Sequence, residues 1–334
     1  MNILYKLHSG KNSKIAYYLR SYLSMAVPDA LLRRRLKKIL RQQLTAEERT
    51  EVEWRTAYYC KHFDTRIPDD ARQLDDHKLK NRNYPSVYFF DSREFTRYFP
   101  KHLRWNYIFG DVIHTPDVPS IVKSRPIGDD NANAVLLNLD KIRHFVFLDD
   151  RIPFTDKSDK AIFRGDVRTK SNRLAFMQRW FGSTICDAGD TTPAATADKL
   201  GLPAEWRKGL IPLRAHLHYK FILALEGNDV ASNLKWVMSS NSLAVMPRPK
   251  YETWFMEGTL IPGVHYVEIA DDFSDLEEKM SHYIAHPDEA EAIIANAHRF
   301  VARFRNPRIE RLISLNVLQR YFEQTGQLPP LGQC

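Results

Sequence analysis

Cysteine is scarce in this chain of 334 residues: Cys60, Cys186 and Cys334 lie far apart, and no two of them form a Cys-X-X-Cys pair. Three widely spaced cysteines predict neither a disulfide framework nor a cysteine metal site, and they favour a reducing compartment. The sequence has no uninterrupted run of about 18 apolar residues, so it predicts no membrane-spanning helix. The charged N-terminal segment lacks the apolar stretch of a secretory signal peptide. We therefore expect a cytoplasmic protein.

Acidic residues are almost absent from positions 1–45, where Asp29 stands against ten lysines and arginines. The whole chain carries a formal net charge of +8, so its basic character belongs to this segment. Two interpretations stay open: a solvated basic face, or an interfacial anchor on an anionic membrane surface. No nucleic-acid-binding motif accompanies the charge, and we expect no nucleic-acid partner.

Helical patterns are clear at the N-terminal end. Apolar residues recur with helical spacing over 14–26, and again after Pro28 in LLRRRLKKILRQ. Thr45 and Glu48 form a capping-box pattern, which predicts a third helix that runs through Tyr59.

From residue 86 onward, short apolar runs alternate with helical segments, which predicts an α/β fold with mainly parallel sheets. The expected strands are SVYFF, YIFGDVI, HFVFLDD, AIFRG, STICDAG, FILALEG, SLAVMP and VHYVEI. The expected helices among them are SNRLAFMQRWFG, NLKWVMSSN and a long segment from Asp275 that breaks at His286-Pro287.

Polar residues crowd the end of the predicted strand FILALEG, which finishes at Gly227. They are Asn228, Asp229, Ser232, Asn233 and Lys235. Ligands bind at the carboxyl ends of strands in open α/β sheets, and a helix that starts near Ser232 would offer backbone N–H groups to phosphate. The alternative is an ordinary strand, turn and capped helix.

A second predicted strand, in KAIFRGDVRTKSNRLAF (160–176), ends in a basic loop. Its members are Arg164, Gly165, Arg168, Lys170 and Arg173. Guanidinium groups bind phosphate in a bidentate manner, so two such strand-end loops suit a diphosphate. The alternative is a surface cluster of arginines.

Taken together, these stretches resemble glycosyltransferase family 90. The resemblance covers about residues 105–305. The residues that carry it are GDVIHTPDVPSIVKSRPI, NANAVLLNLDKIRHFVFLDD, FRGDVRTKSNR, YKFILALEGNDVASNLKWVMSSNSLAV and FMEGTLIPGVHYVEI. IVKSRPI and EGNDVASNLKW are most similar to the bacterial lipopolysaccharide branch.

The resemblance implies a GT-B fold, in which two Rossmann-like domains face a cleft. The domains expected are a basic helical extension (1–50), an acceptor-side domain (51–152) and a nucleotide-sugar-binding domain (153–306). A helix at 307–326 is expected to pack back on the acceptor side. The family inverts the anomeric centre with a UDP-sugar and needs no bound metal or other cofactor.

The resemblance also implies catalytic and acceptor-binding residues. The general base would be Asp117 in HTPDVPS, with Asp111 and Asp149 as alternatives. Pro116 stands where relatives carry a basic residue, and Asn233 stands where eukaryotic relatives carry an arginine, which weakens both matches. Lys123 and Arg125 could bind phosphates of the acceptor, or form structural ion pairs.

The function that we expect is an inverting, metal-independent transfer of a sugar from a UDP-sugar to lipopolysaccharide core, at the cytoplasmic membrane face. Residues 1–45 would hold the enzyme near its lipid-linked acceptor. The alternatives are transfer to capsule or protein, and a non-catalytic nucleotide- or glycan-binding module on the membrane. The sequence does not specify the sugar, the linkage or the oligomeric state.

Overall fold

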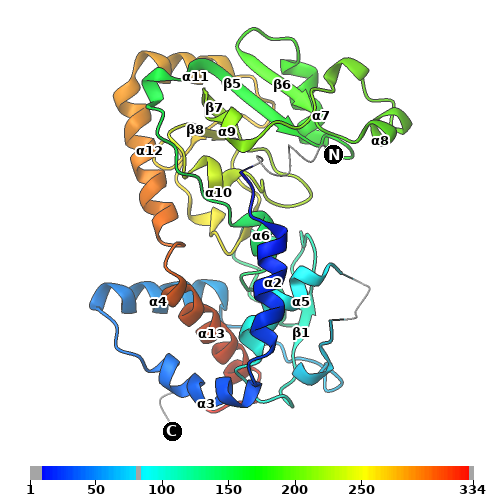
Figure 1. Cartoon of the computed structure of the whole chain (residues 1–334), viewed down its shortest axis with the longest axis vertical. Helices are drawn as coiled ribbons and strands as arrows, with labels where there is room; N and C mark the ends of the chain where they lie inside the picture. Colours follow the sequence, from blue (N-terminus) through cyan, green and yellow to red (C-terminus); the bar gives the residue numbers. More distant parts are fainter. Residues whose placement is uncertain (1–9, 80–83, 331–334) are drawn as a thin grey trace. The chain divides into compact units, whose positions relative to one another are not determined.

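The computed structural model describes residues 10–79 and 84–330 (Figure 1). They fold into two compact units. The five-stranded unit consists of residues 10–12, 143–249 and 258–303. The three-stranded unit consists of residues 13–79, 84–142, 250–257 and 304–330. Within the described part of the chain, no helix is both long and apolar enough to cross a membrane.

A parallel sheet forms the centre of the five-stranded unit (Figure 1). Its strands, in spatial order, are β10 (Val267–Glu268), β8 (Leu243–Met246), β7 (Tyr219–Leu223), β5 (Ser158–Gly165) and β6 (Cys186–Asp190). Central strands of parallel sheets are buried on both faces and read as continuous apolar runs. Phe221 and Ile222 of β7 follow this rule, because both side chains are fully or almost fully buried.

Three long helices complete the core of this unit. They are α7 (Ser171–Trp180), α11 (Leu276–Ala285) and α12 (Pro287–Ala302). Phe176 of α7, Leu276 of α11 and Ile293 of α12 share one cluster with Phe163 and Phe221 of the sheet. The break expected at His286-Pro287 is confirmed, since it separates α11 from α12. The shorter helices of this unit are α8 (Ala194–Lys199), α9 (Leu213–His216) and α10 (Leu234–Val237), and α6 (Lys141–His144) begins in the other unit and ends in this one.

The three-stranded unit contains a parallel sheet in the order β1 (Asn106–Ile108), β2 (Ser120–Val122) and β4 (Ala134–Leu136). A separate antiparallel pair joins β3 (Ser124–Pro126) to β9 (Tyr251–Thr253). The expectation of a mixed α/β fold with mainly parallel sheets is therefore confirmed.

Five helices lie within this unit among the described residues. They are α2 (Lys14–Met25), α3 (Asp29–Leu40), α4 (Ala46–Tyr59), α5 (Ser86–Thr96) and α13 (Pro307–Gln324). The predicted capping box is present, because the Thr45 hydroxyl accepts from the Glu48 amide and the Glu48 carboxylate accepts from the Thr45 amide. Helix α13 packs against α3, α4 and α5.

A buried ion pair ties α4 to α13. The side chain of Arg55 is fully buried, and its Nη2 donates to Oε2 of Glu310 at 3.1 Å. The indole of Trp254 donates to the same carboxylate oxygen at 2.6 Å and stacks on the Tyr59 ring at 3.9 Å. The segment 250–257 therefore belongs to the core of this unit, although it is distant in sequence.

Two expected strands are wrong. SVYFF (86–90) lies in helix α5, where Val87 to Phe90 are all buried. A short apolar run cannot distinguish a buried strand from a helix buried on all sides. HFVFLDD (144–150) begins at the last residue of α6 and then continues without joining a sheet. A side chain takes the place of a neighbouring strand as hydrogen-bond partner here, because the Leu148 amide donates to Oγ of Ser239 at 2.8 Å.

Candidate functional site

Three strand ends of the five-stranded unit lie at one edge of its sheet. β5 pairs in parallel with β7 on one side and with β6 on the other. The loop after β5 spans 166–170, and the loop after β7 spans 224–233. Their parallel register brings both loops, which the sequence predicted as one site, to the same edge.

The guanidinium of Arg173 joins these two loops. Its Nε donates to the carbonyl oxygen of Glu226 at 3.0 Å, and its Nη2 donates to that of Leu225 at 2.7 Å. Nη1 donates to the carbonyl oxygen of Asp166 at 3.0 Å, and the Asn172 amide group also donates to Glu226, at 3.1 Å. Burial lowers the pKa of Arg173 to about 10, so the guanidinium stays charged at neutral pH. Arg173 thus acts as a clamp between the loops.

Two glycines make room for this clamp. A Cβ atom on Gly227 would lie 3.2 Å from Nη2 of Arg173. A Cβ atom on Gly165 would lie 2.7 Å from Cζ of Phe163 and 3.4 Å from Nη1 of Arg173. Both glycines were predicted as site residues, and their structural reason is close approach to a guanidinium.

Arg164 is bonded across the edge of the sheet. Its Nη2 pairs with the Asp187 carboxylate at 2.6 Å, and Nη1 donates to the Asp187 carbonyl oxygen at 2.6 Å. The Tyr219 hydroxyl donates to the same carboxylate at 2.9 Å. Burial acts against ionisation of Asp187, but the bonds from Arg164 and Tyr219 outweigh it and lower its pKa. A phosphate at Arg164 would have to compete with Asp187.

Arg168 is closer to solvent than Arg164. Its side chain is 45% exposed, and its Nε lies 2.8 Å from Oδ2 of Asp166. Thr169 follows with a φ of 54°, a left-handed conformation that β-branched residues rarely adopt. Lys170 is the N-cap of the ten-residue helix α7. An anion in this loop would meet Arg168, Lys170 and the N-terminus of α7, and a strained backbone is common at such functional sites.

The β7–α10 loop differs from its prediction. β7 ends at Leu223 rather than at Gly227, and α10 has only four residues without a side-chain cap. The Asn233 amide group donates to the Leu223 carbonyl oxygen at 2.9 Å, so it fixes the strand end. A helix this short has little dipole to offer to a phosphate.

Other residues of this loop divide by burial. Lys235 is fully buried and Asp229 is 3% exposed. Asn228 and Ser232 are exposed. A contact between the Lys235 ammonium and a bound phosphate would require this side chain to leave its buried position.

The third strand end adds polar residues that we did not predict. Oδ1 of Asp190, at the end of β6, accepts from the amide and hydroxyl of Thr192 at 2.8 and 2.6 Å. The Thr192 hydroxyl also donates to Oδ1 of Asp166 at 2.9 Å. The available signal was the sequence CDAGDTT, a strand that ends in acidic and hydroxyl residues next to the basic loop.

The three candidate bases lie in different surroundings. Asp117, in the three-stranded unit, is exposed, and its backbone carbonyl oxygen accepts from Nδ2 of Asn133 at 3.0 Å. Asp111 of the same unit forms an ion pair with Lys123, whose side chain is 1% exposed. Asp149, in the five-stranded unit, is exposed and lies 3.3 Å from Nη2 of Arg151.

Arg125 is built into the core of the three-stranded unit. Its side chain is fully buried, and Nε donates to Oε1 of Glu252 at 2.7 Å. Nη1 and Nη2 donate to the carbonyl oxygens of Ala134 and Tyr58 at 3.0 and 2.8 Å. These bonds account for Arg125 as the structural ion pair that the sequence left open beside acceptor binding.

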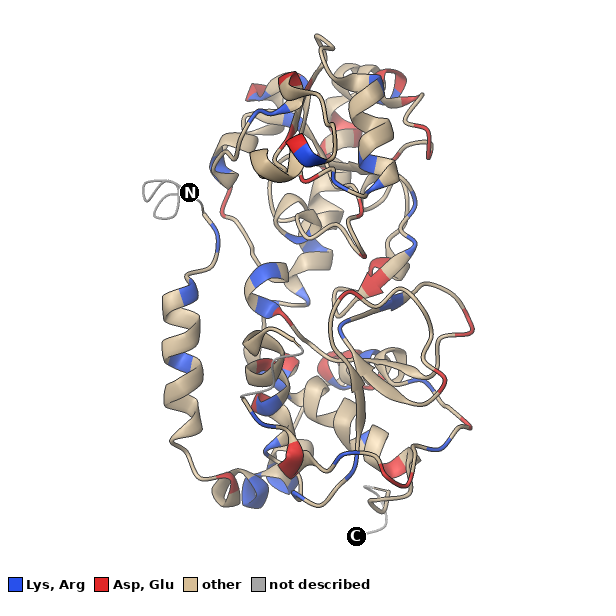
Figure 2. Cartoon of the chain, turned by 90° about the vertical axis from the view of Figure 1, so that its right-hand side faces the viewer, with Lys and Arg blue, Asp and Glu red and all other residues tan. Residues whose placement is uncertain are grey.

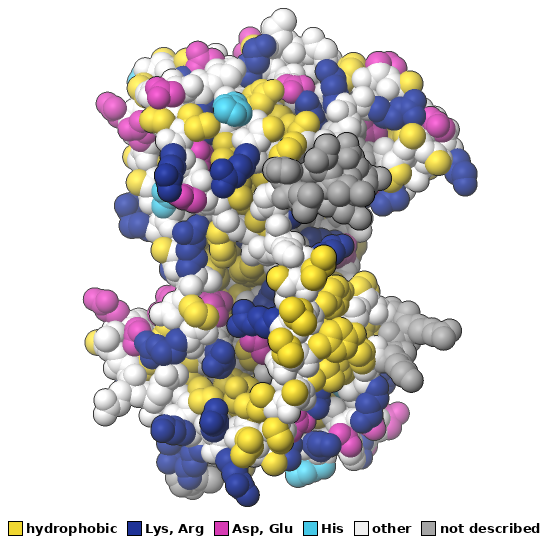
Figure 3. Space-filling model, in the orientation of Figure 1, with side chains coloured by type: hydrophobic (Ala, Val, Ile, Leu, Met, Phe, Trp, Pro, Cys, Tyr) yellow, Lys and Arg dark blue, Asp and Glu magenta, His cyan; other side chains and the backbone are white. Residues whose placement is uncertain are grey.

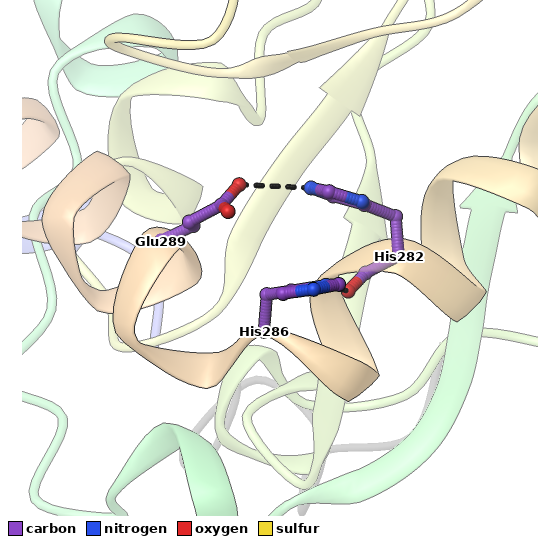
Figure 4. Close-up of side chains that lie close together, drawn as sticks. All are labelled: His282, His286 and Glu289. Atoms are coloured by element: carbon purple, nitrogen blue, oxygen red, sulfur yellow. Dashed lines mark hydrogen bonds and ion pairs between the residues drawn. The ribbon is translucent and has the colours of Figure 1, made fainter.

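Among residues 10–79 and 84–330, one group of three side chains lies close enough together to hold a metal ion (Figure 4). Nε2 of His282 lies 2.8 Å from Oε2 of Glu289, and Nδ1 of His286 lies 2.8 Å from the His282 carbonyl oxygen. The hydrogen bond with His282 lowers the pKa of Glu289. All three residues are exposed where α11 meets α12, and none belongs to the strand-end loops. The pairing of His282 with Glu289 is an ordinary surface interaction at a helix junction.

Comparison with known proteins identifies the family of this chain. Residues 138–322 match the family model described as glycosyl transferase family 90. The chain is also 38% identical over 312 residues to a protein called O-glucosyltransferase LpsA, from Dichelobacter nodosus. That alignment covers 92% of this chain and 95% of the relative. The family match includes both strand-end loops joined by Arg173, and the chain belongs to glycosyltransferase family 90.

Proposed function

We propose that this glycosyltransferase moves a sugar from a UDP-sugar to a hydroxyl group of lipopolysaccharide core. The observation that carries the proposal is the Arg173 clamp, which holds the basic loop after β5 and the polar loop after β7 together in a chain of this family. Glucose is the first sugar to test, because the relative is called an O-glucosyltransferase. The acceptor rests on the resemblance of IVKSRPI and EGNDVASNLKW to the lipopolysaccharide branch.

The donor diphosphate is assigned to the β5–α7 loop. As the bond between the anomeric carbon and the diphosphate oxygen breaks, negative charge grows on the leaving group. Arg168, Lys170 and the N-terminal amides of α7 would stabilise that charge. Asn228 and Ser232, exposed on the neighbouring loop, would supply hydrogen bonds to the donor.

Inversion requires a single displacement. The acceptor oxygen forms a bond to the anomeric carbon while the diphosphate departs from the opposite face, and a base takes the proton of the acceptor hydroxyl. We assign that role to Asp117, whose exposed carboxylate is accessible to an acceptor. The proposal includes a GT-B arrangement, metal-independent transfer and attachment to the cytoplasmic membrane surface.

The first test measures donor binding and turnover separately. UDP and UDP-glucose should raise the melting temperature, because a ligand at about 100 times its Kd adds about 2.7 kcal/mol of stability. The rise should be the same with and without EDTA, because the proposed transfer needs no metal. Asp117→Asn should keep this shift and lower transfer by about 10²–10⁴-fold. Asp130→Asn is the matched control: Asp130 is also exposed, and its backbone carbonyl oxygen accepts from Thr115 at 2.7 Å.

Three outcomes would redirect the proposal. Normal transfer by Asp117→Asn would move the base to Asp111 or Asp149. Stabilisation by UDP without transfer to any acceptor, and without hydrolysis of any UDP-sugar, would favour a non-catalytic binding module. Transfer to capsular glycan or to protein, but not to lipopolysaccharide, would keep the enzyme and change the acceptor.

A further inference from the structure

Helix α2 displays a row of large apolar side chains to solvent. Ile15, Leu19 and Leu23 follow one another at a spacing of four residues and are 83%, 59% and 63% exposed. The row continues through Tyr22, Met25, Val27 and Leu31, which are between 38% and 54% exposed. Figure 3 shows a contiguous hydrophobic patch where Figure 1 places α2. Contiguous exposed patches of this kind mark interaction sites, whereas scattered single residues do not.

Other side chains fasten α2 to its own unit. The Tyr17 hydroxyl donates to Oδ1 of Asp91 at 2.8 Å, and the Tyr18 hydroxyl lies 3.1 Å from Oγ of Ser86. The rings of Tyr18 and Tyr22 both meet Phe90 edge to face, at 5.9 and 5.0 Å. The apolar row is therefore held outward by a docked helix and does not belong to a loose tail.

The turn after α2 is fastened as well. Arg97 donates to the Ser24 carbonyl oxygen at 2.7 Å, and Arg93 and Arg97 pair with Asp29 at 2.6 and 2.8 Å. Asp29 is the sole acidic residue in 13–45, and its charge is neutralised by these two arginines. Burial opposes ionisation of Asp29, but the arginines outweigh it and lower its pKa. No acidic group of this segment is left to repel an anionic surface.

Exposed cations lie beside the apolar row and beyond its end. Arg34, Arg35, Lys37, Lys38 and Arg41 are exposed along and just after α3, and Lys14 and Arg20 are exposed on α2. In Figure 2, α2 is mainly uncharged, and basic residues gather along α3 beyond its end. An aliphatic row bordered by lysine and arginine is the composition of a helix that lies in a membrane interface.

We propose that α2 and α3 form a membrane-docking surface. The row Ile15, Leu19 and Leu23 enters the boundary between headgroups and acyl chains, and the cations of α3 contact anionic headgroups. The cations favour an anionic partner, and the aliphatic row needs an apolar one. An anionic bilayer provides both, whereas nucleic acid provides only the negative charge. This surface deepens the membrane attachment proposed above, but its binding can be measured without any sugar chemistry.

The test is flotation of the full-length chain with two kinds of vesicle: phosphatidylcholine alone, and phosphatidylcholine with about a third phosphatidylglycerol. We expect binding to the anionic vesicles that weakens with salt. Leu19→Gln together with Leu23→Gln should weaken binding at least tenfold. Leu200→Gln together with Leu210→Gln is the matched control, because those leucines are 47% and 49% exposed in the five-stranded unit. Arg34→Gln together with Arg35→Gln should weaken binding about fivefold for each charge removed.

A second measurement reports insertion directly. Leu19→Cys, in a Cys334→Ser background, gives one exposed thiol among the described residues, because Cys60 and Cys186 are buried. An environment-sensitive fluorophore on that thiol should shift to shorter wavelength with anionic vesicles and stay unchanged with neutral ones.

Three results would overturn the proposal: no vesicle binding, vesicle binding that the double leucine variant leaves intact, or a fluorophore that stays in water on bound vesicles. A dimer in solution that the double leucine variant dissolves would assign the row to a second copy of the chain. Transfer to a soluble, lipid-free acceptor should be equal in wild type and in both double leucine variants. Failure of the docking surface is thus distinguishable from failure of the catalytic proposal.

Discussion

Nε of Arg173, on α7, donates to the carbonyl oxygen of Glu226, in the loop after β7, at 3.0 Å. This bond and its two companions join loops that are separated by more than fifty residues of sequence. We expect Arg173→Gln to destabilise the protein by about 3 kcal/mol, because buried carbonyls lose charged donors. It should also abolish stabilisation by UDP. Arg179→Gln is the control on the same helix, where Arg179 is exposed. Urea unfolding with and without UDP measures both effects.

Gly227→Ala should damage the same clamp from the other side. Its new Cβ would lie 3.2 Å from Nη2 of Arg173, so the guanidinium or the loop must shift. We expect a loss of about 1–2 kcal/mol in stability and weaker donor binding. Combined with Arg173→Gln, the two losses should not add, because the alanine then has no guanidinium to displace. Additive losses would show that Gly227 acts through another neighbour.

The buried pair of Arg125 and Glu252 predicts a loss of stability rather than a loss of acceptor affinity. Arg125→Lys cannot reproduce the three directions of hydrogen bonding and leaves Glu252 poorly compensated, so we expect about 3–5 kcal/mol of destabilisation. Arg66→Lys is the control, because Arg66 is exposed in the same unit. A fully stable Arg125→Lys enzyme with a raised KM for acceptor would instead support acceptor binding.

His77 predicts a pH dependence of stability. Burial lowers its pKa to about 4, so the folded protein keeps this imidazole neutral while the unfolded chain protonates it near pH 6.5. The contribution of His77 to the free energy of unfolding is complete above pH 6.5 and is lost as the pH falls toward 4. We expect about 1 kcal/mol of loss between pH 7.5 and 5.5.

The comparison with His77→Gln isolates this contribution. Asp91 acts in the opposite direction, because burial raises its pKa to about 6 and its folded form resists ionisation as the pH rises from 4 to 6. The wild type and His77→Gln share Asp91, so the difference between their unfolding free energies reports on His77 alone. Equal slopes of stability against pH in the two proteins would contradict the prediction.

Local patterns predicted the elements whose signals are local. The Thr45–Glu48 capping box and the break at Pro287 depend on a few neighbouring residues, and both are present. SVYFF was wrong because its apolar run has no period, and burial on all sides of α5 removes the alternation that separates helix from strand.

The candidate site shows a similar division. Composition pointed to the two polar strand-end loops, but the sequence could not show that Arg173 would bond backbone carbonyls while Arg168 stays near solvent. That difference arises from the pairing of β5 with β7 and from side-chain directions on α7. The burial of Lys235 could not be predicted for the same reason: it follows from packing around a helix of four residues, which no spacing rule reveals.

The chain crosses between its two units five times, after residues 12, 142, 249, 257 and 303. Neither unit is therefore a continuous stretch of the gene. A single recombination breakpoint near residue 142 would deliver the β5–α7 and β7–α10 loops together with β9 and α13, which belong to the other unit's core. A chimera made at this breakpoint should misfold when its α4 comes from a parent in which the residues that contact Glu310 and Trp254 differ. In this lineage, new donor or acceptor preferences are thus expected to evolve by substitution within loops, and not by exchange of whole halves.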